Sequence, residues 1–110
     1  MNKDKTLKFA PHLVPLVLSG EKTTTWRLFD DKDLQKGDRL IFINKETGKE
    51  FAKAVITEVR ETELGEVTED DYDGHEKFES KEKMLEAYRG YYGLKVIPNS
   101  VLKIISFNLL

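Results

Sequence analysis

The stretch with the most chemical potential is GEKTTTWRLF, residues 20–29. A threonine hydroxyl beside a lysine amine is a possible pair of nucleophile and base, provided that burial or a nearby cation lowers the pKa of the amine. Lys22 and Thr25 stand three residues apart in this stretch. Arg27 adds a planar guanidinium that can hold a carboxylate, a phosphate or the edge of a base.

The same stretch has the composition of a β-strand, in which alternate side chains point to opposite faces. One face would carry Thr24, Trp26 and Leu28, and the other Thr23, Thr25 and Arg27. The first set suits a core and the second a polar recess. Lys22, at the junction between Gly20 and the strand, is able to reach the polar side. The alternative is an edge strand with a threonine-rich solvent face and a surface lysine.

The first half of the chain contains the elements that would hold this strand in place. Residues 6–9 read as a short strand, and PHLVPLVLSG, residues 11–20, as a short helix with Pro15 near its first turn and Gly20 at its C-terminal end. A loop over residues 30–38 leads to RLIFIN, residues 39–44. This apolar run predicts a strand covered on both faces.

The second half predicts a hairpin turn at residues 45–48, with Gly48 free to adopt a positive φ, and a long strand over 49–64. An acidic loop over 65–79 follows. Residues 80–93 predict the clearest helix, and residues 100–110 a strand within the sheet. In the helix, Ser80 is a suitable N-cap, Gly93 ends it, and one apolar stripe combines Met84, Leu85, Tyr88, Tyr91 and Tyr92.

This order of elements predicts an α+β fold in a single domain, residues 1–110. Consecutive strands and a hairpin favour a curved antiparallel sheet, and partial closure into a small β-barrel with flanking short helices would hide the strand edges.

Composition narrows the function classes. The chain has 110 residues and no cysteine, which leaves no disulfide or zinc–thiolate site, and its net charge is -2. Residues 1–60 carry 12 Lys/Arg against 9 Asp/Glu, whereas residues 61–110 carry 6 against 11. This asymmetry allows a basic patch for nucleic acid in the first half, and the alternative is a solvated surface with unevenly spread charge. With no apolar run of membrane-spanning length, we expect a cytoplasmic protein. Its many charged residues and single glutamine are typical of thermophiles.

Other possible sites are weaker. In EDDYDGHEKFES, residues 69–80, alignment of Gly74 with the glycine of a calcium loop places Ser80 where a bidentate glutamate is required. His12 and His75 are the only histidines and have no spaced partner, so no metal or other cofactor is expected. His75 beside Glu76 could line a recess. The tyrosines of the last helix could stack bases, although helical spacing favours core packing.

Gly20, Lys22, Thr25 and Arg27 match G-x-K-x-x-T-x-R, and the chain thereby resembles the ASCH superfamily, the activating-signal-cointegrator homology domains. The short preceding helix, KGDRLIFI, GHEKFES before a tyrosine-rich helix, and the final strand extend the resemblance over essentially the whole chain. It implies a PUA-like β-barrel associated with RNA binding.

Some small bacterial members hydrolyse N4-acetylcytidine to cytidine and acetate. The resemblance therefore implies catalytic roles for Lys22, Thr25 and a loop glutamate, for which we choose Glu76 over Glu69 and Glu79. Arg27, Thr23 and His75 are the expected substrate-binding residues. The expected partner is a nucleoside or single-stranded RNA. The alternatives are a non-catalytic RNA-binding module and a protein-interaction domain, because a fold does not fix a function.

Overall fold

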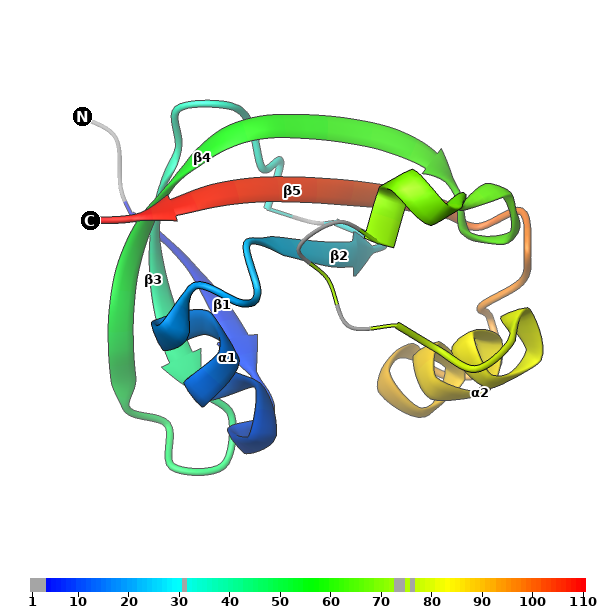
Figure 1. Cartoon of the computed structure of the whole chain (residues 1–110), viewed down its shortest axis with the longest axis horizontal. Helices are drawn as coiled ribbons and strands as arrows, with labels where there is room; N and C mark the ends of the chain where they lie inside the picture. Colours follow the sequence, from blue (N-terminus) through cyan, green and yellow to red (C-terminus); the bar gives the residue numbers. More distant parts are fainter. Residues whose placement is uncertain (1–3, 31, 73–74, 76) are drawn as a thin grey trace.

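The computed structural model describes residues 4–30, 32–72, 75 and 77–110. Its strands and helices follow the predicted order, with β2 shorter than the predicted strand. Figure 1 shows a strongly curled sheet with the two α-helices beside it. The elements are β1 Lys5–Phe9, η1 Pro11–Leu13, α1 Val14–Ser19, β2 Thr24–Leu28, β3 Arg39–Asn44, β4 Glu50–Glu63, η2 Leu64–Glu66, η3 Glu69–Tyr72, α2 Lys81–Tyr92 and β5 Val101–Leu109.

The five strands form one sheet in the order β1-β3-β4-β5-β2, so β1 and β2 are its two edges. The α+β fold and the half-barrel form are confirmed, but the sheet is mixed, because β1 pairs with β3 in parallel. After β1 the chain crosses through α1 to β2 at the opposite edge, and it returns so that β3 runs in the direction of β1. The other three pairs are antiparallel.

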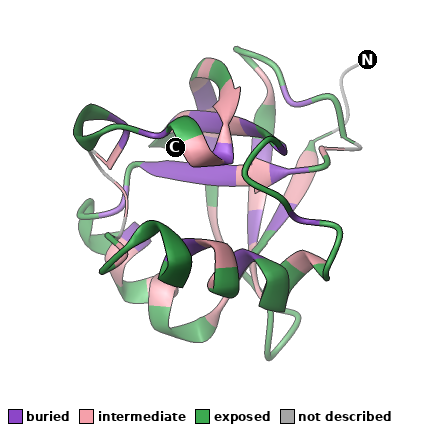
Figure 2. Cartoon of the chain, turned by 90° about the vertical axis from the view of Figure 1, so that its right-hand side faces the viewer, coloured by how far each residue is buried: buried purple, intermediate pink, exposed green. Residues whose placement is uncertain are grey.

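The chain has two apolar clusters, which lie on opposite faces of β5. β5 serves both, because Ile104 packs in one cluster and its neighbour Ile105 in the other. The inner cluster of the half-barrel contains Leu7, Phe9, Val17, Leu34, Leu40, Phe42, Ala54, Ile56, Ile105 and Phe107. The cluster under α2 contains Trp26, Leu28, Leu64, Val67, Met84, Tyr88, Val96, Leu102 and Ile104. Figure 2 shows the outer side of α2 largely exposed.

Cover of β3 differs from the prediction. Leu40 and Phe42 are fully buried, whereas Ile41 and Ile43 are only partly buried. Alternate residues thus point into the half-barrel and toward its less protected outer side, and the expected cover on both faces was wrong for this strand.

The predicted helix ends are confirmed. Ser80 caps α2 by accepting a hydrogen bond from the N–H of Lys83 at 3.1 Å, and Gly93 ends the helix at φ 97°. Gly20 ends α1 in the left-handed region at φ 83°. That sharp turn directs the chain from α1 into β2. No helix in the described part of the chain is long and apolar enough to span a membrane.

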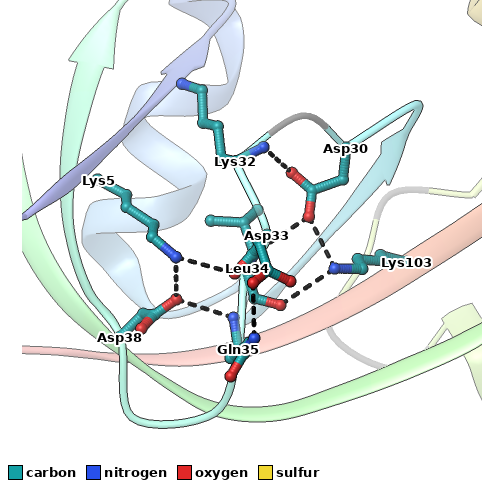
Figure 3. Close-up of polar contacts among 8 residues, drawn as sticks. All are labelled: Lys5, Asp30, Lys32, Asp33, Leu34, Gln35, Asp38 and Lys103. Atoms are coloured by element: carbon teal, nitrogen blue, oxygen red, sulfur yellow. Dashed lines mark hydrogen bonds and ion pairs between the residues drawn. The ribbon is translucent and has the colours of Figure 1, made fainter.

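The β2–β3 loop is fastened to the sheet by charged hydrogen bonds (Figure 3). The Asp30 carboxylate accepts from Lys103 Nζ at 2.8 Å and from the N–H of Leu34 at 2.9 Å. Asp38 accepts from Lys5 Nζ, also at 2.8 Å. These contacts join the loop to β5 and β1, and they hold the buried side chain of Leu34 in the inner cluster. The path of the chain from the end of β2 to β3 is therefore fixed by these contacts.

Candidate functional site

A cavity of about 360 Å³ lies where the two sheet edges, η1 and helix α2 approach one another. Its size is within the range of small-molecule sites. β1, β2 and α2 all contribute to its wall, and the turn between β3 and β4 reaches its rim. The described lining residues are Lys8, Phe9, Ala10, His12, Leu13, Lys22, Thr25, Trp26, Arg27, Lys45, His75, Phe78, Tyr88, Tyr91 and Tyr92.

Lys22 and Thr25 both line this cavity, and each is only 4% exposed. Lys22 is held by the turn at Gly20, where its N–H donates to the carbonyl of Leu16 at 3.0 Å. Thr25 is held by the ladder of β2, in which it lies opposite Ile105 of β5. The backbone thus fixes the positions of both residues. The two are brought together at one cavity, as their spacing suggested.

Arg27 lies beside them and joins the two edges of the sheet. Its Nε donates to Oγ1 of Thr25 at 3.1 Å, and its Nη2 donates to the carbonyl of Lys8 at 3.2 Å. The guanidinium also lies 5.0 Å from the centre of the Phe9 ring. Burial lowers the pKa of Arg27, an effect that the nearby phenols of Tyr92 and Tyr88 partly oppose. An arginine remains cationic in proteins despite such a shift, so a positive charge lies against the threonine hydroxyl.

Trp26 is buried, as predicted, and it also forms part of the cavity wall. The ring of His75 stacks on the indole, with centres 4.0 Å apart and planes 15° apart. Tyr88 lies nearly parallel to the indole at 6.4 Å. The Trp26 Nε1–H is the one buried side-chain polar atom of the described residues that has no hydrogen-bond partner. Flat rings of this kind suit the stacking of a nucleobase.

The tyrosines of α2 depart from the predicted apolar stripe. Tyr88 is buried in the cluster under α2, but Tyr91 is 56% exposed and Tyr92 is half-buried. All three line the cavity. Tyr88 therefore packs in the core, as the helical spacing predicted. Tyr91 instead lies on the exposed side of the cavity, where Lys45 Nζ is 5.9 Å from the centre of the Tyr91 ring.

Not every predicted site residue is brought together. Thr23 is exposed and lies outside the cavity lining, because β2 begins one residue later. Its carbonyl accepts from the N–H of Phe107, a structural role in the sheet. Glu69 and Glu79 are exposed and also lie outside the lining, and Glu69 pairs with Lys77 at 3.4 Å. Glu76 falls outside the described residues, and its catalytic role stays a prediction.

Sequence reasoning missed seven lining residues: Lys8, Phe9, Ala10, His12, Leu13, Lys45 and Phe78. Phe9 and Phe78 read as ordinary apolar positions, and the two lysines as surface charges. The motif does not mark them, since they come from four separate parts of the chain that meet only in the fold. The described residues contain no group of three His, Cys, Asp or Glu side chains that could hold a metal ion.

Comparison with known proteins agrees with this architecture. The family model of the ASCH domain matches residues 2–89. The chain belongs to the ASCH domain family. Among solved structures, a protein from Enterococcus faecalis V583 is similar with a TM-score of 0.80 at 21% identity, over 100% of this chain and 82% of that one.

Two further structures share the ASCH fold of this chain. The ASCH domain from Lactobacillus crispatus JV V101 has a TM-score of 0.70 at 20% identity, over 98% of this chain and 80% of that chain. A solution structure of a Pyrococcus furiosus protein has a TM-score of 0.68 at 21% identity, over 98% of both chains. Curated proteins give no match. At these identities the structural likeness shows the fold alone.

Proposed function

We propose that the cavity of this ASCH domain binds a cytosine nucleoside and that the protein hydrolyses N4-acetylcytidine to cytidine and acetate. The observation that carries the proposal is the meeting of Lys22 and Thr25, both buried, in a cavity that also contains the stacked rings of Trp26 and His75. The first pair supplies a base and a nucleophile. The second supplies a flat apolar surface for the pyrimidine.

In the proposed reaction, Lys22 takes a proton from Thr25 or from a water molecule as that oxygen attacks the acetyl carbonyl. The tetrahedral intermediate collapses with cleavage of the bond between the acetyl carbon and N4, and the proton taken by Lys22 passes through Glu76 to the leaving amine, which restores both side chains. Acetate forms directly if water attacks. If Thr25 attacks, a water molecule then hydrolyses the acetyl-threonine ester, which releases acetate and restores the hydroxyl.

Arg27 has a more specific role in this proposal than the sequence suggested. Because its Nε donates to Oγ1 of Thr25, the threonine oxygen acts as an acceptor there, and the hydroxyl proton is directed elsewhere. A cation beside that oxygen also stabilises negative charge that develops during attack. Arg27 thus positions and activates Thr25, in addition to any contact with the base.

The test is acetate release from N4-acetylcytidine, followed by the change in base absorbance. Lys22→Ala and Thr25→Ala should each abolish it. The matched control is Thr23→Ala, because Thr23 is the same residue type on the same segment but is exposed and outside the cavity. Absence of acetate release by the wild-type protein across neutral to alkaline pH would refute the reaction. Release that survives both cavity substitutions would refute the assigned roles.

The second candidate is a non-catalytic RNA-binding module, which one observation favours. Aromatic surface continues beyond the cavity to Phe29, which is 42% exposed, contacts Tyr92 at 5.8 Å and has Lys95 Nζ 4.5 Å from its ring centre. Such a surface could stack a further base. An RNA binder should lose affinity with salt at a slope near -0.7 per phosphate contact on single strands. Absence of any RNA binding at low salt would exclude this candidate.

A further inference from the structure

The mouth of the cavity carries positive charge that the proposed deacetylation does not use. Lys8, on β1, and Lys45, in the turn after β3, are both exposed lining residues. Neither makes an ion pair or a side-chain hydrogen bond within the described part of the chain. By contrast, Lys5 and Lys103 are each paired with an aspartate at 2.8 Å. The two mouth lysines thus keep their donors available for a ligand.

The distribution of charge in the wall points to an anion. Besides Lys22, the proposed base, the basic side chains of the described lining are Lys8, Arg27 and Lys45, and that lining contains no carboxylate. The whole chain has a net charge of -2, so this positive charge is a local feature of the cavity. Like charges that converge on one opening repel one another unless an anion binds between them. A neutral nucleoside would leave the charges of Lys8 and Lys45 without a partner.

The depth of each residue type indicates where the anion lies on the ligand. Trp26 and Tyr88 are buried, whereas Lys8, Lys45 and Tyr91 are the exposed residues of the same cavity lining. A base stacked inside therefore directs its sugar toward the mouth. Lys45 is already held near this position by its cation–π contact with Tyr91.

We infer that Lys8 and Lys45 bind a phosphate attached to the ribose of the bound nucleoside, so that the preferred ligand is a nucleotide and not a free nucleoside. The inference rests on the proposed use of the cavity for a cytosine base. It does not require catalysis. A phosphate suits the site because its oxygens accept several charge-assisted hydrogen bonds at once, and two flexible lysines from separate elements can approach it from different sides.

The experiment compares cytidine with 5′-CMP and 3′-CMP by quenching of Trp26 fluorescence. Trp26 is the only tryptophan of the chain and lines the cavity, so its signal reports occupancy. At low salt, one of the nucleotides should bind about tenfold more tightly than cytidine, as expected for charge-assisted contacts. Added salt should reduce the difference. A cytidylyl dinucleotide is the third arm. If the dinucleotide binds more tightly than either monophosphate, the preferred phosphate is a bridging one of an RNA backbone. If it binds more weakly, the preferred phosphate is a terminal one.

Lys8→Ala and Lys45→Ala should each bring the nucleotide affinity closer to that of cytidine and leave cytidine binding unchanged. Lys49→Ala is the matched control, because Lys49 belongs to the same hairpin as Lys45 and is exposed outside the cavity lining. Equal affinities for cytidine and both nucleotides would overturn the inference and leave the proposed deacetylation intact. A nucleotide preference that persists in the double variant would overturn it as well. Failure of every ligand to bind would overturn both proposals.

Discussion

The Nε of Arg27 donates a hydrogen bond to Oγ1 of Thr25 at 3.1 Å. The two residues lie two positions apart in β2, on the same face of the strand. Arg27→Lys keeps the positive charge but removes the planar fork that also reaches the carbonyl of Lys8. We expect acetate release to fall by about 10- to 100-fold, since one charge-assisted hydrogen bond to the nucleophile is lost. Steady-state kinetics should show the loss in kcat. An unchanged kcat would contradict the positioning role.

A second prediction concerns the proton donor. Glu76→Gln keeps the shape of the side chain and removes its proton carrier, so turnover should fall while the affinity for cytidine changes little. Glu69→Gln and Glu79→Gln are the controls, because both residues are exposed outside the cavity lining. Loss of turnover in either control, with full activity in Glu76→Gln, would transfer the role to that glutamate.

Trp26 provides a test of the shared role of β2 in core and cavity. Trp26→Ala should lower the free energy of unfolding by about 3–5 kcal/mol, because a large side chain is removed from the cluster under α2. Trp26→Phe keeps an aromatic ring and removes the unpartnered Nε1–H, so it should cost much less. Denaturant unfolding followed by circular dichroism measures both. Wild-type tryptophan emission typical of a solvent-exposed indole would contradict this placement.

The Asp30–Lys103 ion pair predicts a pH dependence of stability. Burial of the Asp30 carboxylate raises its pKa, but hydrogen bonds from Lys103 Nζ and the N–H groups of Leu34 and Lys32 outweigh this effect and leave the pKa below its usual 3.8. The hydrogen bond that Lys103 Nζ donates to the Asp30 carboxylate is the main cause that raises the pKa of Lys103, against the effect of burial. The Asp30 contribution is thus present above about pH 4 and lost as pH falls through the lowered pKa. The Lys103 contribution is lost as pH rises through its raised pKa.

Asp30→Asn should therefore be less stable than the wild type at neutral pH, by about 3 kcal/mol, because it leaves a partly buried cation without its charged partner. The difference should shrink below pH 4. Asp33→Asn is a suitable control, since Asp33 is an exposed aspartate in the same loop. Parallel stability curves for Asp30→Asn and the wild type from pH 2 to 7 would contradict the assignment.

Much of the fold follows from local sequence signals. Ser80 and Gly93 predicted the ends of α2, Gly20 the end of α1 and Gly48 the hairpin turn, because caps and positive-φ positions depend on a few neighbouring atoms. The motif residues also predicted the shared position of Lys22 and Thr25. Thr23 was wrongly placed at the recess, since alternation gives a face but not the residue at which a strand begins.

The sequence by itself determined the α+β class, the element order, the ASCH signature and the burial of Trp26. Only the tertiary structure decided the parallel pairing of β1 with β3 and the composition of the cavity wall. Lys8, Lys45 and Tyr91 are far apart along the chain, and they meet because the strand order places β1 and β2 at opposite edges of a sheet that curls until those edges approach. Such long-range pairing depends on the whole sheet, so no local pattern encodes it.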